Sequence, residues 1–98
     1  MSYKIRFTQA SKKDFSKLDN SQQIQIRKSI LKLENQGMNC GQLLSGKLSD
    51  CKKLKHKRLG LRIIFKESEL GIEIIEIIAI GKRDDKEVYD IAVKRLMR

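Results

Sequence analysis

The 98-residue sequence lacks features that define several common classes of protein. Its two cysteines, Cys40 and Cys51, have no spacing typical of a metal site or a redox motif, which predicts two free thiols and a reducing, cytoplasmic location. The most apolar stretch, residues 72–80, contains two glutamates and is far too short to cross a bilayer, so we expect no membrane partner. Residues 1–4 lead directly into an alternating strand pattern, which argues against a signal peptide.

Histidine is almost absent, since His56 is the single copy in the chain. A typical ribonuclease moves protons with two histidines, or with a histidine and a carboxylate, and the basic segment around His56 offers neither pair. Proline, low-complexity tracts and internal repeats are absent as well. With 98 residues and 40% hydrophobic content, the sequence predicts one small folded domain that spans residues 1–98.

Acidic residues are in the minority, because 22 lysines and arginines face 12 aspartates and glutamates, for a net charge of +10. A folded domain this basic usually meets nucleic acid, an anionic surface or an acidic protein, and a merely soluble basic protein is the plain alternative. The excess is concentrated in residues 47–66, which favours a phosphate-binding face there. Beside one acid, Asp50, this segment contains eight cations: Lys47, Lys52, Lys53, Lys55, Lys57, Arg58, Arg62 and Lys66.

The pattern of apolar residues predicts a small α+β fold. We expect the last three strands to form an antiparallel meander, which the first strand joins. Two helices separated by a short break are expected to form a hairpin that covers one face of the sheet. We therefore expect a two-layer domain with an antiparallel sheet of about four strands, an N-terminal helical hairpin and a C-terminal helix, in the order β-α-α-β-β-β-α. The expected elements are a strand at 3–7, a short helix capped by Thr8, a longer helix capped by Ser21 and ended by Gly37, a loop at 38–49, strands at 51–57, 61–66 and 72–80, and a helix at 85–97.

Residues 81–89 follow the most buried predicted strand and read Gly-Lys-Arg-Asp-Asp-Lys-Glu-Val-Tyr. Asp84 and Glu87 have the spacing of a capping box, so the last helix is expected to begin near this point. Arg83 then lies at the corner between strand and helix, with Tyr89 in the first turns. A guanidinium and a phenol near one corner suit a site that grips a phosphate and stacks a nucleobase, although Tyr89 packed only between helix and sheet is the alternative.

Alternation along the basic strand places its lysines on one face and His56 on the other. These lysines fit a phosphate-binding surface, and they also fit a solvated strand face that is guarded against aggregation. Arg62 on the next strand is interpreted either as a clamp on phosphate oxygens or as half of a cross-strand ion pair with a glutamate. The lysines that share this face are Lys53, Lys55 and Lys57.

The order of elements, the basic meander and the closing motif resemble the RelE toxins of bacterial toxin–antitoxin pairs, within the RelE/ParE superfamily. The resemblance covers essentially the whole chain. Besides residues 81–89 it includes the Ala-Val-Lys-Arg-Leu of 92–96, the Leu-Ser-Gly of 44–46 and the Gly-Leu-Arg of 60–62. It implies an enzyme that enters the ribosomal A site and cuts messenger RNA there, with no metal or other cofactor. It also implies a cognate antitoxin as partner, with operator DNA bound only through the toxin–antitoxin complex.

The resemblance also implies roles for particular residues. The two active-site lysines of the family fall on Lys53 and Lys55, the arginine that stabilises the transition state falls on Arg62, and the stacking tyrosine falls on Tyr89. The second catalytic arginine falls on Arg83, as an acid or as an electrostatic aid to the leaving 5′-oxygen. The surrounding cations expected to bind nucleic acid are Lys47, Lys52, Lys57, Arg58 and Lys82. The sequence departs from the best-known family pattern at Lys52 and His56, where a more apolar residue is common.

Chemistry without histidine or carboxylate must rely on lysine and arginine. Clustered cations disfavour one another's charge, which lets a lysine act as a base, and attack by the 2′-hydroxyl places negative charge on phosphate oxygens that an arginine neutralises. Two other functions stay open at this point. A ParE-like toxin of the same fold inhibits DNA gyrase, and a non-enzymatic corepressor binds nucleic acid only together with its antitoxin.

Overall fold

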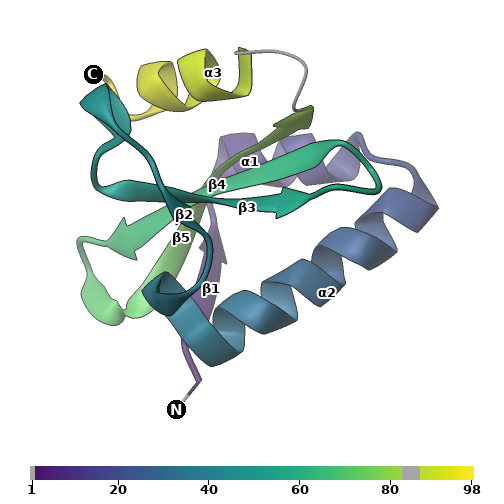
Figure 1. The fold of residues 1–98 in the computed structure, drawn as a ribbon, viewed down its shortest axis with the longest axis horizontal. Coiled ribbons are helices and arrows are strands. Elements are labelled where there is room, and N and C mark those ends of the chain that lie inside the picture. The colour runs from purple at the N-terminus through teal and green to yellow at the C-terminus, as the bar shows by residue number, and fades with distance from the viewer. Residues whose placement is uncertain (1, 83–86) are drawn as a thin grey trace.

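The structure is a computed structural model that describes residues 2–82 and 87–98. Within these residues, helices lie on both faces of a five-stranded sheet (Figure 1). The elements in chain order are β1 (Lys4–Phe7), α1 (Gln9–Ser16), α2 (Asn20–Gln36), the 3-10 helix η1 (Gly37–Asn39), β2 (Gln42–Leu43), the 3-10 helix η2 (Gly46–Leu48), β3 (Cys51–His56), β4 (Leu61–Ser68), β5 (Gly71–Lys82) and α3 (Glu87–Arg95). The predicted α+β class is confirmed, and the element order is as predicted apart from the added strand β2, but helices on both faces make three layers instead of the expected two.

The sheet has the order β1-β5-β4-β3-β2. Strands β3, β4 and β5 form the predicted antiparallel meander, and β1 joins its edge by pairing with β5. This last pairing is parallel, so the sheet is mixed rather than wholly antiparallel, and β2 adds a fifth strand from within the expected loop at 38–49. Two residues are too few for an alternating pattern, which is why the sequence did not reveal β2.

The helix starts follow local capping chemistry. Thr8 caps α1 as predicted, since its Oγ1 accepts a hydrogen bond from the Ser11 N–H at 3.0 Å. The predicted Ser21 cap for α2 is wrong, because α2 begins at Asn20 and Asp19 caps it. Asp19 Oδ1 accepts from the Gln22 N–H at 2.8 Å, while Gln22 Oε1 accepts from the Asp19 N–H at 3.1 Å. This reciprocal capping box satisfies two helix-end donors, which a cap at Ser21 would leave open.

Two apolar clusters pack against opposite faces of the sheet. The larger one lies under α1 and α2 and includes Ile26, Leu33, Leu54 and Phe65. The helices of the predicted hairpin lie over different strands, α1 over β5 and β1 and α2 over β1 and β3. The smaller cluster lies under α3 and includes Cys51, Ile64, Ile78, Val88 and Ala92. The hairpin-on-sheet packing therefore holds for one face, and α3 forms a smaller layer on the other.

The strand lengths differ modestly from the predicted ones. Strands β4 and β5 extend the predicted strands at 61–66 and 72–80, so the turn between them shrinks to two residues. Of the predicted helix at 85–97, Glu87–Arg95 is helical, and residues 85 and 86 lie outside the described residues. None of the helices in the described part of the chain is both long and apolar enough to span a bilayer.

Candidate active site

The register of β3 and β4 decides which cations face α3. Lys53 pairs with Ile64, and Lys55 pairs with Arg62. Because Ile64 belongs to the cluster under α3 and Leu54 belongs to the cluster under α2, the pleat directs Lys53, Lys55 and Arg62 toward α3. Lys53 and Lys55 therefore share one face of the sheet, as predicted. This is the face that α3 covers only in part.

Tyr89 of α3 brings two of these cations together. Its hydroxyl oxygen accepts hydrogen bonds from Arg62 Nη1 and from Lys53 Nζ, the latter at 3.4 Å. The centroid of its ring lies 5.6 Å from Arg62 Cζ and 5.7 Å from Lys53 Nζ. Lys53, Arg62 and Tyr89, from three different elements, thus form one group, here called the Tyr89 cluster. Tyr89 is half-buried, so it packs on the sheet and also presents its polar end to the cations.

In the part of the chain that the structure describes, Arg62 forms no ion pair with a carboxylate. Its partner on β5 is Gly81, so neither Glu73 nor Glu76, the candidates for a cross-strand ion pair, lies opposite it. Among the described residues, no hydrogen-bond partner reaches the buried Arg62 Nε. A buried donor without a partner is costly, so this nitrogen calls for an explanation. Arg62 also lines a small cavity of about 100 Å³ together with Lys55, His56, Lys57 and Leu61.

Gly81 allows α3 to approach the sheet at this site. A Cβ atom at residue 81 would lie 3.0 Å from Val88 Cγ2 and 3.1 Å from Val88 Cβ, so any larger side chain would push the helix outward. Val88 directly precedes Tyr89 and is 3% exposed. The glycine of the 81–89 motif is thus explained by packing, since it brings the first turn of α3 within reach of β4.

The other predicted site residues are spread around this cluster. Lys55 is exposed opposite Arg62, and the exposed Lys57 and Arg58 lie in or beside the turn between β3 and β4. Lys82 ends β5 and Lys47 lies in η2, and both are exposed. Arg83 and the expected cap Asp84 lie outside the described residues. The predicted roles of these residues in catalysis or in binding nucleic acid stay predictions.

Lys52 differs from its neighbours, because it lies on the other face of β3. Its Nζ donates a hydrogen bond of 2.6 Å to the main-chain oxygen of Met38 in η1. The structure therefore does not bring Lys52 together with the Tyr89 cluster, although the sequence grouped it with the cations that bind nucleic acid. Alternation likewise puts His56 on the Leu54 face, as predicted.

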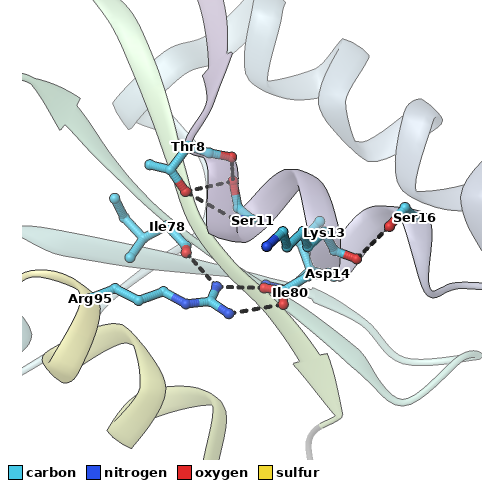
Figure 2. A network of polar contacts seen from close by, with 8 residues as sticks. All are labelled: Thr8, Ser11, Lys13, Asp14, Ser16, Ile78, Ile80 and Arg95. Carbon is cyan, nitrogen blue, oxygen red and sulfur yellow. Dashed lines mark hydrogen bonds and ion pairs between the residues drawn. The ribbon is translucent and has the colours of Figure 1, made fainter.

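Sequence reasoning missed an ion pair at the edge of β5 (Figure 2). Arg95 of α3 and Asp14 of α1 form a bidentate contact, with Nη1 2.6 Å from Oδ2 and Nη2 2.9 Å from Oδ1. The same groups bind the β5 backbone, since Arg95 Nη1 donates to the Ile78 oxygen at 2.9 Å and Asp14 Oδ2 accepts from the Ile80 N–H at 3.0 Å. Because the partners are 81 positions apart in the sequence, no local signal pointed to this contact.

A second ion pair ties the last residue of the chain to the start of β3. Arg98 donates to both carboxylate oxygens of Asp50, with Nη2 2.7 Å from Oδ2, and to the main-chain oxygen of Lys47 at 3.0 Å. The Arg98 hydrogen bond holds the pKa of the Asp50 carboxyl well below its ordinary value. The single acid of the basic segment 47–66 is therefore paired and does not face the Tyr89 cluster cations as a counter-ion.

The chemistry of the site follows from this donor set. The Tyr89 cluster and Lys55 offer cationic donors and one phenol, which match an oxyanion and would repel a metal cation. In the described residues, no three histidine, cysteine, aspartate or glutamate side chains lie close enough to hold a metal ion together. A fold with helices on both faces of a small mixed sheet, carrying a cationic site next to a tyrosine, defines a class of small basic α+β proteins whose site suits an anionic ligand.

Comparisons with known proteins give the family. No profile of a known protein family matches the chain. The chain is 30% identical over 96 residues to a RelE-like toxin protein of Escherichia coli, covering 98% of this chain and 99% of that protein. It is 29% identical over 98 residues to the mRNA interferase toxin RelE of Escherichia coli strain K12, covering 99% of this chain and all of that one. The chain belongs to the RelE family of toxins from toxin–antitoxin systems.

Solved structures of this family agree with the fold. The free state of a mutant of the Escherichia coli toxin RelE superposes with a TM-score of 0.80 at 27% identity, covering 98% of this chain and 99% of that one. A complex of that mutant toxin with a peptide of its antitoxin RelB matches with a TM-score of 0.69 at 27% identity, covering 97% and 98% of the two chains. The resemblance inferred from the sequence is therefore confirmed.

Proposed function

We propose that this toxin is a ribosome-dependent endoribonuclease that cuts messenger RNA in the ribosomal A site. The observation that carries the proposal is the convergence of Arg62 and Lys53 on the hydroxyl of Tyr89. That convergence places a phosphate clamp, a potential proton acceptor and an aromatic ring within one small region. Relatives that bear the name mRNA interferase support the same reaction class.

The reaction we propose is an in-line attack within the message itself. The 2′-oxygen of one nucleotide forms a bond to the adjacent phosphorus while the bond from phosphorus to the 5′-oxygen breaks, leaving a 2′,3′-cyclic phosphate and a 5′-hydroxyl. The proton of the 2′-hydroxyl passes to a neutral lysine, Lys53 or Lys55, and a proton is delivered to the leaving 5′-oxygen. Arg83 is proposed to assist at that oxygen, as an acid or through its charge.

Arg62 is proposed to bind the non-bridging phosphate oxygens as their negative charge grows. A guanidinium holds two oxygens in a fixed fork geometry, which a lysine does not match. The buried Nε has no partner among the described residues. Stabilisation by Arg62 acts most strongly on the transition state, because the charge on the phosphate oxygens is greatest there.

Tyr89 is proposed to hold a base that has left its stack. Contact between a base and an aromatic ring contributes about 1–3 kcal/mol. Its hydroxyl has a second role, since it fixes the positions of Arg62 and Lys53 before the message arrives. Substrate binding would then exchange a contact between side chains for contacts with phosphate.

Dependence on the ribosome follows from what the cluster lacks. Without a histidine or carboxylate to move protons, the described site is a poor catalyst for free RNA. The ribosome supplies a message held in a bent, reactive geometry, which replaces part of the missing catalytic power. We also propose that no metal takes part, because the site presents cations where a metal would need anions.

The proposed partners follow from the same family. A cognate antitoxin is expected to bind and silence the toxin, as a peptide of RelB binds the mutant Escherichia coli RelE. Operator DNA is expected to be bound only by the toxin–antitoxin complex. Action on ribosomes places the working protein in the cytoplasm.

The test is end-mapping of a defined message on ribosomes programmed with a known A-site codon. With the wild-type protein we expect cuts confined to that codon, and on the same message without ribosomes we expect cutting to be slower by several orders of magnitude. Intact messages together with inhibited supercoiling by gyrase would overturn the proposal in favour of a ParE-like activity. Intact messages with salt-sensitive DNA binding alone would favour the corepressor.

A further inference from the structure

Strand β5 extends beyond the strand that covers its edge. β1 pairs with Ile74–Ile77 only, so the part of β5 that leads to the site has no neighbouring strand on that side within the described residues. The Ile78 oxygen and the Ile80 N–H at this edge are bound instead by Arg95 and Asp14 (Figure 2). Two side chains from different helices thus take the place of a strand.

The Asp14–Arg95 pair is more than a surface contact. The two side chains are 16% and 25% exposed, and their contact is bidentate. Each partner also binds a β5 backbone group, so three elements are joined at one point: α1, β5 and α3. Directional contacts of this kind fix a relative position, whereas apolar packing tolerates sliding and rotation.

The element held in this way is the helix that carries Tyr89. Arg95 lies six residues beyond Tyr89, which is about 9 Å along the axis of α3. At the other end, Val88 packs against Gly81 and fixes how closely the helix approaches the sheet. Fixing Arg95 therefore sets the shift and rotation of α3, and these decide whether the Tyr89 hydroxyl meets Arg62 and Lys53.

We propose that Asp14 and Arg95 are positioning residues for Tyr89, acting through α3 although neither touches the Tyr89 cluster. This inference rests on the proposed function, because it assigns the pair a role in that reaction. The inference assigns two separate roles to residues of α3. Tyr89 contacts the substrate, and Arg95 holds the helix in the register that lets it do so.

The composition of the chain provides a direct probe. It contains two tyrosines and no tryptophan, so a Tyr3→Phe background leaves Tyr89 as the only strong intrinsic fluorophore. In that background we expect Arg95→Ala to raise the acrylamide quenching constant of Tyr89 at least twofold, since the ring leaves its half-buried position. Lys94→Ala is the matched control, because it removes an exposed cation from the neighbouring position of α3 and should leave quenching unchanged.

The kinetic signature separates positioning from loss of binding. On programmed ribosomes, we expect Arg95→Ala to lower the maximal single-turnover cleavage rate 10- to 100-fold, while the half-saturating ribosome concentration changes less than threefold. Arg95→Lys keeps the charge and loses the planar fork of the guanidinium, so it should recover part of the rate. Adding Asp14→Ala to Arg95→Ala should cost little more than either change alone, because both break the same contact.

A milder variant guards against simple unfolding. Asp14→Asn keeps an oxygen for the Ile80 N–H and removes the charge that pairs with Arg95, so it should fold and still show an intermediate loss of rate and an increase in quenching. Wild-type quenching and rate in both Asp14→Asn and Arg95→Ala would overturn the inference. If the wild-type protein cuts no message, the proposed function fails. The quenching comparison then still decides whether the pair positions Tyr89.

Discussion

Two adjacent lysines on β3 lead to opposite sides of the sheet. Lys53 reaches the Tyr89 hydroxyl on the α3 side, at 3.4 Å. Lys52 donates at 2.6 Å to the Met38 oxygen on the side of α2. The two residues are chemically identical and lie on the same strand, and they differ only in the face of the sheet to which strand alternation directs their side chains. Register therefore selects which cations of the basic segment join the site.

The helices on the two faces also differ in how much of the sheet they cover. The 17-residue α2 and the helix α1 close a large apolar core, while the nine-residue α3 covers a smaller one. Lys55 and the turn residues Lys57 and Arg58 stay exposed at the end of the meander. A short helix on the site face thus combines a fixed tyrosine with open access for a large substrate.

Removing the guanidinium on the site face should have the largest effect. We expect Arg62→Ala to lower single-turnover cleavage on programmed ribosomes by about 100-fold or more, a loss typical of removing one donor that binds a developing oxyanion. Arg62→Lys should fall between Ala and wild type, because it keeps the charge and loses the fork. The cleavage rate at saturating toxin measures both.

Arg27 provides the matched control on the other face. It is an exposed arginine on α2 whose Cζ lies 5.3 Å from the centroid of the Phe15 ring, so it too combines a cation with an aromatic ring. We expect Arg27→Ala to change the cleavage rate less than threefold at saturating toxin. Equal losses from the two arginine variants would break the comparison between the faces.

Substitutions at Tyr89 separate its ring from its hydroxyl. Tyr89→Ala removes the ring on which we propose that a base stacks, and we expect a loss of about 1–3 kcal/mol, or roughly 5- to 150-fold in cleavage rate. Tyr89→Phe keeps the ring and removes the acceptor for Arg62 and Lys53, so its loss should be smaller. A Phe variant as impaired as the Ala variant would show that the hydroxyl, not the ring, carries the effect.

The buried Cys51, at the start of β3, should have a smaller effect, on the free energy of unfolding at alkaline pH. Burial, and then the nearby Asp50 carboxylate, raise the pKa of the Cys51 thiol from 9.0 to about 11. Between these values the folded protein holds a proton that the unfolded chain has lost, so the free energy of unfolding falls as the pH rises, by about 1 kcal/mol per unit. Chemical denaturation from pH 8 to 11 measures this slope.

The comparison variant for this slope is Cys51→Ala. All other groups, the buried Cys40 thiol included, are common to both proteins, so only the contribution of the Cys51 thiol should disappear from the pH dependence. A slope that is unchanged by Cys51→Ala would contradict the origin assigned to it here.

Part of this architecture was predictable because its signals are local. Alternation in the meander, the Thr8 cap and the 81–89 motif each depend on residues close in the sequence. They were enough to predict the α+β class, whereas the placement of Lys53, Arg62 and Tyr89 in one site came from the resemblance to the RelE toxins. The pairing of Lys55 with Arg62 then follows from the short turn between β3 and β4.

The remaining features depend on contacts between distant residues. The parallel pairing of β1 with β5 and the Asp14–Arg95 contact arise only when the whole chain is folded. Lys52 was grouped with the nucleic-acid-binding cations by its charge, although strand alternation places it on the face opposite Lys53, where it reaches the Met38 carbonyl. Charge counts in a segment give no information about which face of a strand each charge occupies.

The most direct test compares Lys53→Ala with Lys52→Ala in the same cleavage assay. Both variants remove one lysine from adjacent positions and change the net charge equally. We predict that Lys53→Ala lowers the single-turnover rate on programmed ribosomes at least tenfold, whereas Lys52→Ala lowers it less than threefold. Equal losses, or a larger loss from Lys52→Ala, would contradict the claim that the α3 face of β3 is the catalytic one.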